Sequence, residues 1–118
     1  LFAAALCLSP RGPGLFAIDN LDQALNPRLV TALTSRLIDW LGSASAPRQL
    51  MFTAHNPAVL DGLDLDNNNV RLFAVDRDSS GHTVVRRLEM TAELRKMNRD
   101  FPLSRLWMMG HLGAVPNV

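Results

Sequence analysis

The stretch that decides the fold is LFAIDNLD, residues 15–22. Four apolar residues, Leu15 to Ile18, end on the acidic Asp19, and Gly12-Pro13-Gly14 precedes them. A short apolar run bounded by turn residues predicts a strand buried on both faces, as in a parallel sheet. Ligands of open parallel sheets bind beyond the carboxyl ends of the strands, so we expect Asp19 at the ligand-binding edge. A carboxylate there suits Mg²⁺ at a nucleotide site, and an Asp that merely caps the next turn is the alternative.

A helix and a second strand follow this run. Asn26-Pro27 is a good helix start, with Asn as the N-cap and Pro at the first helical position. Four leucines at four-residue steps, with Val30 and Ile38 beside them, predict one core-facing side that ends at Gly42: Leu29, Leu33, Leu37 and Leu41. Residues 49–54 predict another buried strand. A strand, a helix and a strand form a βαβ unit with parallel strands, which brings Asp19 and His55 to one edge of the sheet.

The second half of the chain predicts a hairpin and short helices. Residues 70–75 and 83–88 suit two strands joined through Ser80-Gly81, a hairpin-type turn. Thr91 predicts the start of a helix that runs to about Asn98, and Pro102 the start of another that ends at Gly110. The fold class is therefore α/β, with parallel central strands and a C-terminal β-hairpin plus short helices.

The charge and the cysteine content of the chain limit the kinds of binding partner and compartment that we expect. The net charge of +1 over 118 residues indicates no dedicated polyanion binder. Residues 70–118 are mildly basic, with seven Arg and one Lys against five acids. Arg77, Arg86 and Arg87 flank the predicted hairpin and could contact a nucleic-acid backbone, although such arginines are more often plain surface. The single Cys7 cannot form an internal disulfide, which suits a cytosolic protein.

The first eight residues, LFAAALCL, begin without a helix cap. They predict the end of a helix entered midway, so we expect the chain to be a fragment of a larger soluble protein. A secretory segment is disfavoured because no basic residues precede the apolar run. The run is also too short to span a bilayer.

Two motifs carry a family resemblance. FAIDNLDQALNPRLV and MFTAHNPAVLDGLDL, with the helix between them, resemble the C-terminal half of the catalytic core of ABC-type ATPases. They are most similar to AAA-family ATPases related to the OLD, SMC and bacterial defence-system enzymes, and the tail FPLSRLWMMGHLGAVPNV is similar to the way those proteins end. The resemblance implies part of a three-layer P-loop NTPase fold. Residues 1–8 would end a helix, residues 15–65 would run from Walker B to the switch histidine, and residues 70–118 would add the last strands and short helices.

The resemblance also assigns roles to single residues. Asp19 resembles the Walker B aspartate, which supports Mg²⁺ through its water shell, and His55 resembles the switch histidine, which contacts the γ-phosphate and the attacking water. Asn20 departs from the family pattern, because a glutamate usually orients that water. An amide can position water but cannot accept its proton. Asp22 is the nearby carboxylate, and four roles stay open for it: a base, a group that supports Mg²⁺ without binding it directly, a group serving the partner's site, or simply a turn-stabilising Asp.

The resemblance implies ATP and Mg²⁺ as cofactors and hydrolysis by a parent ATPase at a head-to-tail homodimer interface in the cytoplasm. The 118 residues contain no G-x-x-x-x-G-K-[S/T] phosphate loop and no signature motif, so this chain alone is expected to be inactive. Two alternatives stay open. The parent could be an ATP-dependent dimerisation switch that signals to an effector such as a nuclease, or the chain could be an inactive remnant.

Overall fold

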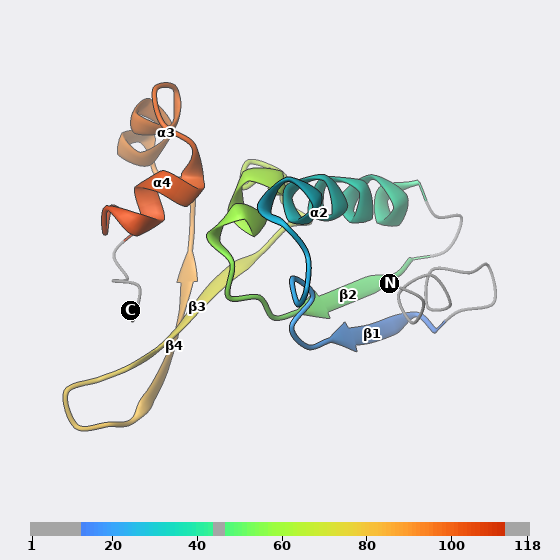
Figure 1. Cartoon of the computed structure of the whole chain (residues 1–118), viewed down its shortest axis with the longest axis horizontal. Helices are drawn as coiled ribbons and strands as arrows, with labels where there is room; N and C mark the ends of the chain where they lie inside the picture. The colour runs from blue at the N-terminus through green and yellow to red at the C-terminus, as the bar shows by residue number, and fades with distance from the viewer. Residues whose placement is uncertain (1–12, 44–46, 113–118) are drawn as a thin grey trace. The chain divides into compact units, whose positions relative to one another are not determined.

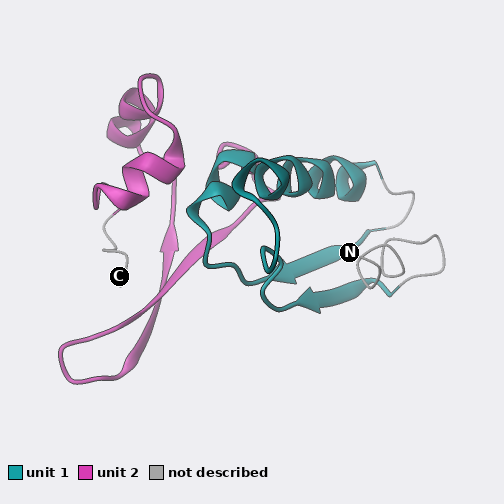
Figure 2. Cartoon of the chain, viewed as in Figure 1, with its two compact units in different colours: residues 1–62 teal, residues 63–118 magenta. Residues whose placement is uncertain are grey.

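The computed structural model describes residues 13–43 and 47–112, so the helix end expected over residues 1–8 lies outside the described residues. The chain forms two compact units, residues 1–62 and residues 63–118 (Figure 2). The elements of the first unit are β1 (Leu15–Ile18), α2 (Pro27–Gly42), β2 (Gln49–Phe52) and the 3-10 helix η1 (Pro57–Gly62). Those of the second are β3 (Leu72–Arg77), β4 (Thr83–Leu88), α3 (Ala92–Asn98) and α4 (Leu103–Met108).

The first unit is the predicted βαβ arrangement. β1 and β2 pair in parallel, from Leu15 opposite Gln49 to Ile18 opposite Phe52. Figure 1 shows α2 and η1 on one side of this strand pair. α2 begins where the sequence predicts, since the side chain of Asn26 accepts a hydrogen bond from the Leu29 N–H at 3.0 Å.

The buried face of α2 matches the predicted stripe in part, since Val30 and Leu37 belong to that stripe and Thr34 does not. Val30, Thr34 and Leu37 are at most 1% exposed, whereas Leu29 is 53% exposed. Steps of four residues advance about 40° per step around a helix with 3.6 residues per turn, so the leucines spiral away from any one face. The polar Thr34 is tolerated in the core because its hydroxyl donates to the Val30 carbonyl at 2.9 Å.

The strands are buried on one face only, so the expectation of burial on both faces is wrong. Phe16 is 7% exposed, whereas Leu15 and Met51 are 64% and 65% exposed. Successive side chains of a strand point to opposite faces, which explains how neighbours in one strand differ so strongly. An apolar run does not by itself show that both faces are covered.

The second unit holds the predicted hairpin. β3 and β4 pair antiparallel, from Leu72 opposite Leu88 to Arg77 opposite Thr83, and they form a sheet separate from β1–β2. β3 therefore starts and ends later than the predicted strand over residues 70–75. The turn closes through Asp78, whose carboxylate accepts the N–H groups of Ser80 and His82 at 2.9 and 2.8 Å.

Both predicted short helices of this unit are confirmed. The Thr91 hydroxyl oxygen accepts the Leu94 N–H at 3.1 Å and so caps α3. Gly110 follows α4 with a φ of 80°, the left-handed conformation that commonly ends helices. Buried side chains of the unit include Leu88, Leu94, Leu103 and Leu106. Across the residues that the structure describes, no helix has the length and apolar character needed to cross a bilayer.

η1 packs tightly against α2 at Gly62, where an added Cβ would lie 2.5 Å from the Thr31 carbonyl oxygen. We expect Gly62→Ala to lower the free energy of unfolding by about 1–3 kcal/mol, because that helix backbone cannot move aside freely. Gly42→Ala is the control: nothing lies within 4 Å of the added Cβ, and the change should be neutral or stabilising by up to about 1 kcal/mol. Urea unfolding measures both, and equal midpoints for the two variants would contradict the close packing.

Candidate functional site

The candidate site lies where β1 and β2 end, in the first unit. The parallel pairing continues beyond the two strands, since the Thr53 N–H donates to the Ile18 carbonyl at 3.0 Å. The Leu21 N–H in turn donates to the Thr53 carbonyl at 3.0 Å. The two segments that follow the strands therefore meet at one edge, as the predicted βαβ unit requires. They carry all the residues that the sequence suggests for the site: Asp19, Asn20, Asp22 and His55.

Thr53 connects the two segments through its side chain. Its hydroxyl donates a hydrogen bond to Oδ1 of Asp19 and accepts one from the Asn20 N–H at 2.9 Å. The sequence reasoning missed this residue. The register that pairs Ile18 with Phe52 places the next two residues, Asp19 and Thr53, opposite each other, and this register is known only from the structure.

Asn20 adopts a left-handed backbone conformation with a φ of 51°. Asn tolerates this conformation better than most residues. Its carbonyl accepts the Gln23 N–H at 3.0 Å, which closes the turn after β1. Asn20 thus has a local backbone reason to be an asparagine, in addition to any role toward water.

Asp22 reaches from the first segment to the second. Its Oδ2 accepts the backbone N–H groups of His55 and Asn56 at 3.0 and 2.6 Å. The side-chain oxygen of Asn56 then accepts the Ala58 N–H at 3.0 Å, at the start of η1. Asp22 therefore holds the backbone that carries the candidate switch histidine.

The donor set suits a magnesium ion bound mainly by water and phosphate. Asp19 is exposed and offers a carboxylate next to the Thr53 hydroxyl. No group of three or more His, Cys, Asp or Glu side chains that could hold a metal occurs among residues 13–43 and 47–112. Mg²⁺ commonly binds proteins through one or two carboxylates and keeps several waters. The residues at this edge fit that mode and do not fit an all-protein metal cage.

Comparison with known proteins identifies the family. Residues 1–61, more than half of the chain, match the family model described as "AAA domain, putative AbiEii toxin, Type IV TA system". The chain belongs to this AAA-domain family. Among curated proteins, none matches the chain. The region from residue 1 to residue 61 of this AAA domain is therefore ATPase-like, and it includes β1, β2 and the segments that follow them.

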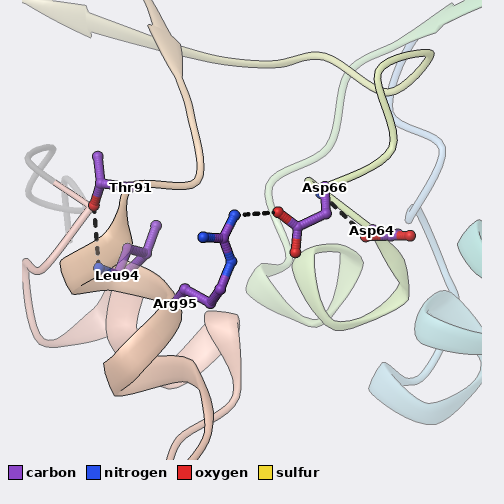
Figure 3. A network of polar contacts seen from close by, with 5 residues as sticks. All are labelled: Asp64, Asp66, Thr91, Leu94 and Arg95. Atoms are coloured by element: carbon purple, nitrogen blue, oxygen red, sulfur yellow. Dashed lines mark hydrogen bonds and ion pairs between the residues drawn. The ribbon is translucent and has the colours of Figure 1, made fainter.

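A groove of about 330 Å³ lies in the second unit, and none of the candidate site residues lines it. Its lining residues are Leu65, Asp66, Asn68, Val70, Arg87, Leu88, Glu89 and Met90. The charges around it are paired within the unit. Arg87 contacts Glu89 at 3.3 Å, and Arg95 contacts Asp66 at 2.6 Å. Figure 3 shows the contact between Arg95 and Asp66. The hydrogen bond and the charge of Asp66 raise the pKa of Arg95. Because these groups satisfy one another, the groove gives less reason for a ligand than the edge at Asp19.

The Arg95–Asp66 contact is exposed, so we expect its contribution to stability to depend on salt. Arg95→Gln should lower the Tm at low ionic strength more than Lys96→Gln, which removes the same charge from the next residue of α3. The difference should shrink in about 1 M NaCl, where the screening length falls to about 3 Å. Thermal unfolding of both variants at low and high salt measures it. A difference that does not change with salt would contradict an electrostatic contact.

Proposed function

We propose that this AAA domain supplies the Walker B and switch-histidine half of a Mg-ATP site, and that the parent ATPase hydrolyses ATP. The supporting observation is the edge of the β1–β2 pair. There the side chain of Thr53 binds Asp19, and the side chain of Asp22 binds the backbone of His55. Family membership supports a nucleotide-binding, ATPase-like function for residues 1–61.

Each residue has a role that its chemistry allows. Asp19 would accept hydrogen bonds from the water shell of Mg²⁺, an ion that neutralises charge on the phosphate oxygens. His55 would donate a hydrogen bond where negative charge builds during phosphoryl transfer. Asn20 would orient the attacking water by hydrogen bonding, but it cannot take the proton. If a carboxylate takes the proton, Asp22 is the candidate base.

The rest of the site would come from outside these 118 residues, which contain no phosphate-loop motif. In the proposed assembly the parent protein supplies that loop, completes a three-layer sheet and forms a head-to-tail homodimer like that of the OLD and SMC relatives. Localisation in the cytoplasm is part of the same proposal, and the single Cys7 of the sequence suits it. A nucleic-acid partner remains a weak prediction, since one of the three hairpin arginines, Arg87, is paired with Glu89.

A second candidate function is an ATP-dependent switch with little turnover. Asn20 favours it, because an amide replaces the usual glutamate in the family pattern. The long-lived ATP-bound dimer would then pass a conformational signal to an effector such as a nuclease. The family description places related domains in a toxin–antitoxin system, which suits a signalling role.

The metal role of Asp19 predicts a loss of nucleotide binding. We expect Asp19→Ala to weaken the affinity for Mg-ATP in the parent protein by about 10- to 100-fold, the usual range for groups that support a bound metal ion. Asp39→Ala removes an exposed carboxylate from α2 and should change nothing. Isothermal titration measures both variants. Equal affinity for wild type and Asp19→Ala would remove Asp19 from the site.

The two candidate functions predict different effects of a substitution at Asn20 on the rate of ATP hydrolysis. If the protein is a switch that lacks a base, Asn20→Glu should raise the single-turnover rate by about 100-fold, a typical contribution of a general base. Asn20→Gln is the control, because it places a similar side chain in the same left-handed backbone without adding a carboxylate. A rate that does not rise, or that rises equally in both variants, would count against the switch.

A further inference from the structure

The two segments that follow β1 and β2 hold each other through side chains in both directions. Thr53, after β2, binds Asp19 and Asn20, and Asp22, after β1, binds the backbone of the β2 segment. We propose that Thr53 and Asp22 are positioning residues, here called the reciprocal clamp, which fix the carboxylate of Asp19 relative to His55. The role of Asp22 is then to hold backbone and not to accept a proton. This inference rests on the proposed Mg-ATP site.

Thr53 is suited to fix the direction of a carboxylate. Its hydroxyl has one hydrogen to donate, which goes to Asp19, while the same oxygen accepts the Asn20 N–H. The hydroxyl is thus oriented by one bond while it makes the other. Thr is β-branched and stiff at χ1, which limits its alternatives further. The bond uses Oδ1 of Asp19, so Oδ2 remains the oxygen for a water of the magnesium shell.

Asp22 is suited to fix a backbone. Both of its hydrogen bonds to the second segment fall on one oxygen, Oδ2, and the donors are the N–H groups of His55 itself and of Asn56. Bonds to a charged acceptor are about twice as strong as neutral ones. They set the position of the His55 backbone, and hence the point from which the imidazole starts.

The anchoring continues past the clamp into the helical part of the unit. Asn56 accepts the Ala58 N–H, and the Ala58 carbonyl accepts the Thr31 hydroxyl of α2 at 2.8 Å. Asp22 is therefore the first link of a chain of hydrogen bonds that runs from the turn after β1, through the His55 segment, to α2. A residue committed in this way is better placed to hold geometry than to accept a proton from water.

Conservative substitutions separate a positioning role from a catalytic one. Asn at position 22 keeps an oxygen that can accept both N–H groups but cannot act as a base, whereas Ala removes both abilities. In the full-length protein we expect Asp22→Ala to lower kcat by about 10- to 100-fold, because small displacements of reacting groups are that costly. Asp22→Asn should restore kcat to within a few-fold of wild type. The same pair of changes at Asp39, an exposed carboxylate of α2, is the matched control.

The role of Thr53 is tested by the Mg²⁺ concentration that hydrolysis requires, again with conservative substitutions. Thr53→Val keeps the shape of the side chain but removes the hydroxyl, and it should raise the Mg²⁺ concentration needed for half-maximal hydrolysis by about tenfold. Thr53→Ser keeps the hydroxyl and should restore most of that affinity. A merely structural threonine would alter stability without a selective effect on the Mg²⁺ requirement.

Amide hydrogen exchange reports the clamp without any need for ATP. In Asp22→Ala, but not in Asp22→Asn, the amides of His55 and Asn56 should exchange about tenfold faster or more, since their acceptor is lost. The Asn20 amide should respond in the same way to Thr53→Val and be restored by Thr53→Ser.

The outcomes are distinguishable. Loss of kcat in Asp22→Asn equal to that in Asp22→Ala, with amide protection kept in Asp22→Asn, would show that Asp22 is the base and overturn its positioning role. Unchanged exchange in Asp22→Ala would overturn the clamp itself. Wild-type protein that neither binds nor hydrolyses Mg-ATP would overturn the proposed function, while the exchange data would still decide whether the reciprocal clamp exists.

Discussion

β1 and β2 leave their sheet in the same direction, because they pair in parallel, and this constraint shapes the rest of the first unit. The register that aligns Ile18 with Phe52 places Asp19 beside Thr53 one residue later. A parallel connection needs a crossover, and α2 provides it. The site is thus a consequence of strand pairing: any shift of register by one residue would turn Asp19 and Thr53 away from each other.

The turn after β1 shows how the same side chains serve folding and chemistry. Its backbone is strained, since Asn20 and Ala24 have φ values of 51° and 62°. For a residue with a Cβ this conformation costs roughly 1–2 kcal/mol. The hydrogen bonds from Thr53 and to Asp22 offset such a cost and keep the turn in one arrangement. Substitutions at the clamp should therefore affect stability and positioning together, which is why conservative replacements are needed to separate the two.

The local signals in the sequence specify the elements well and their burial less well. Asn26 with Pro27 marks the start of α2, and Thr91 marks the start of α3, because caps depend on a few adjacent residues. The buried face of α2 contains Val30 and Leu37, which the apolar pattern marks, and also Thr34, which a pattern of apolar residues cannot mark. Whether an apolar strand face is covered depends on segments that are distant in sequence, so no local pattern predicts it.

The candidate site, too, could be predicted from the sequence only in part. The meeting of the Asp19 and His55 segments follows from the βαβ pattern, which is a rule of topology. The part played by Thr53 follows only once the register is known. The bonds from Asp22 to the backbone of the other segment depend on the path of a strained turn, and nothing in the spacing of residues reveals that path. A carboxylate near a site suggests a base, whereas its backbone partners can be recognised only in three dimensions.

The exposure of the site has a chemical consequence. Asp19 and His55 are both exposed in the first unit. Hydrogen bonds aimed at developing charge stabilise a transition state far better where water is excluded, because the local dielectric constant is lower. Phosphoryl transfer also depends mainly on positioning and electrostatics. In the proposed ATPase, the phosphate loop of the parent and a head-to-tail partner would exclude water from this edge, and a partner that does so would couple hydrolysis to assembly.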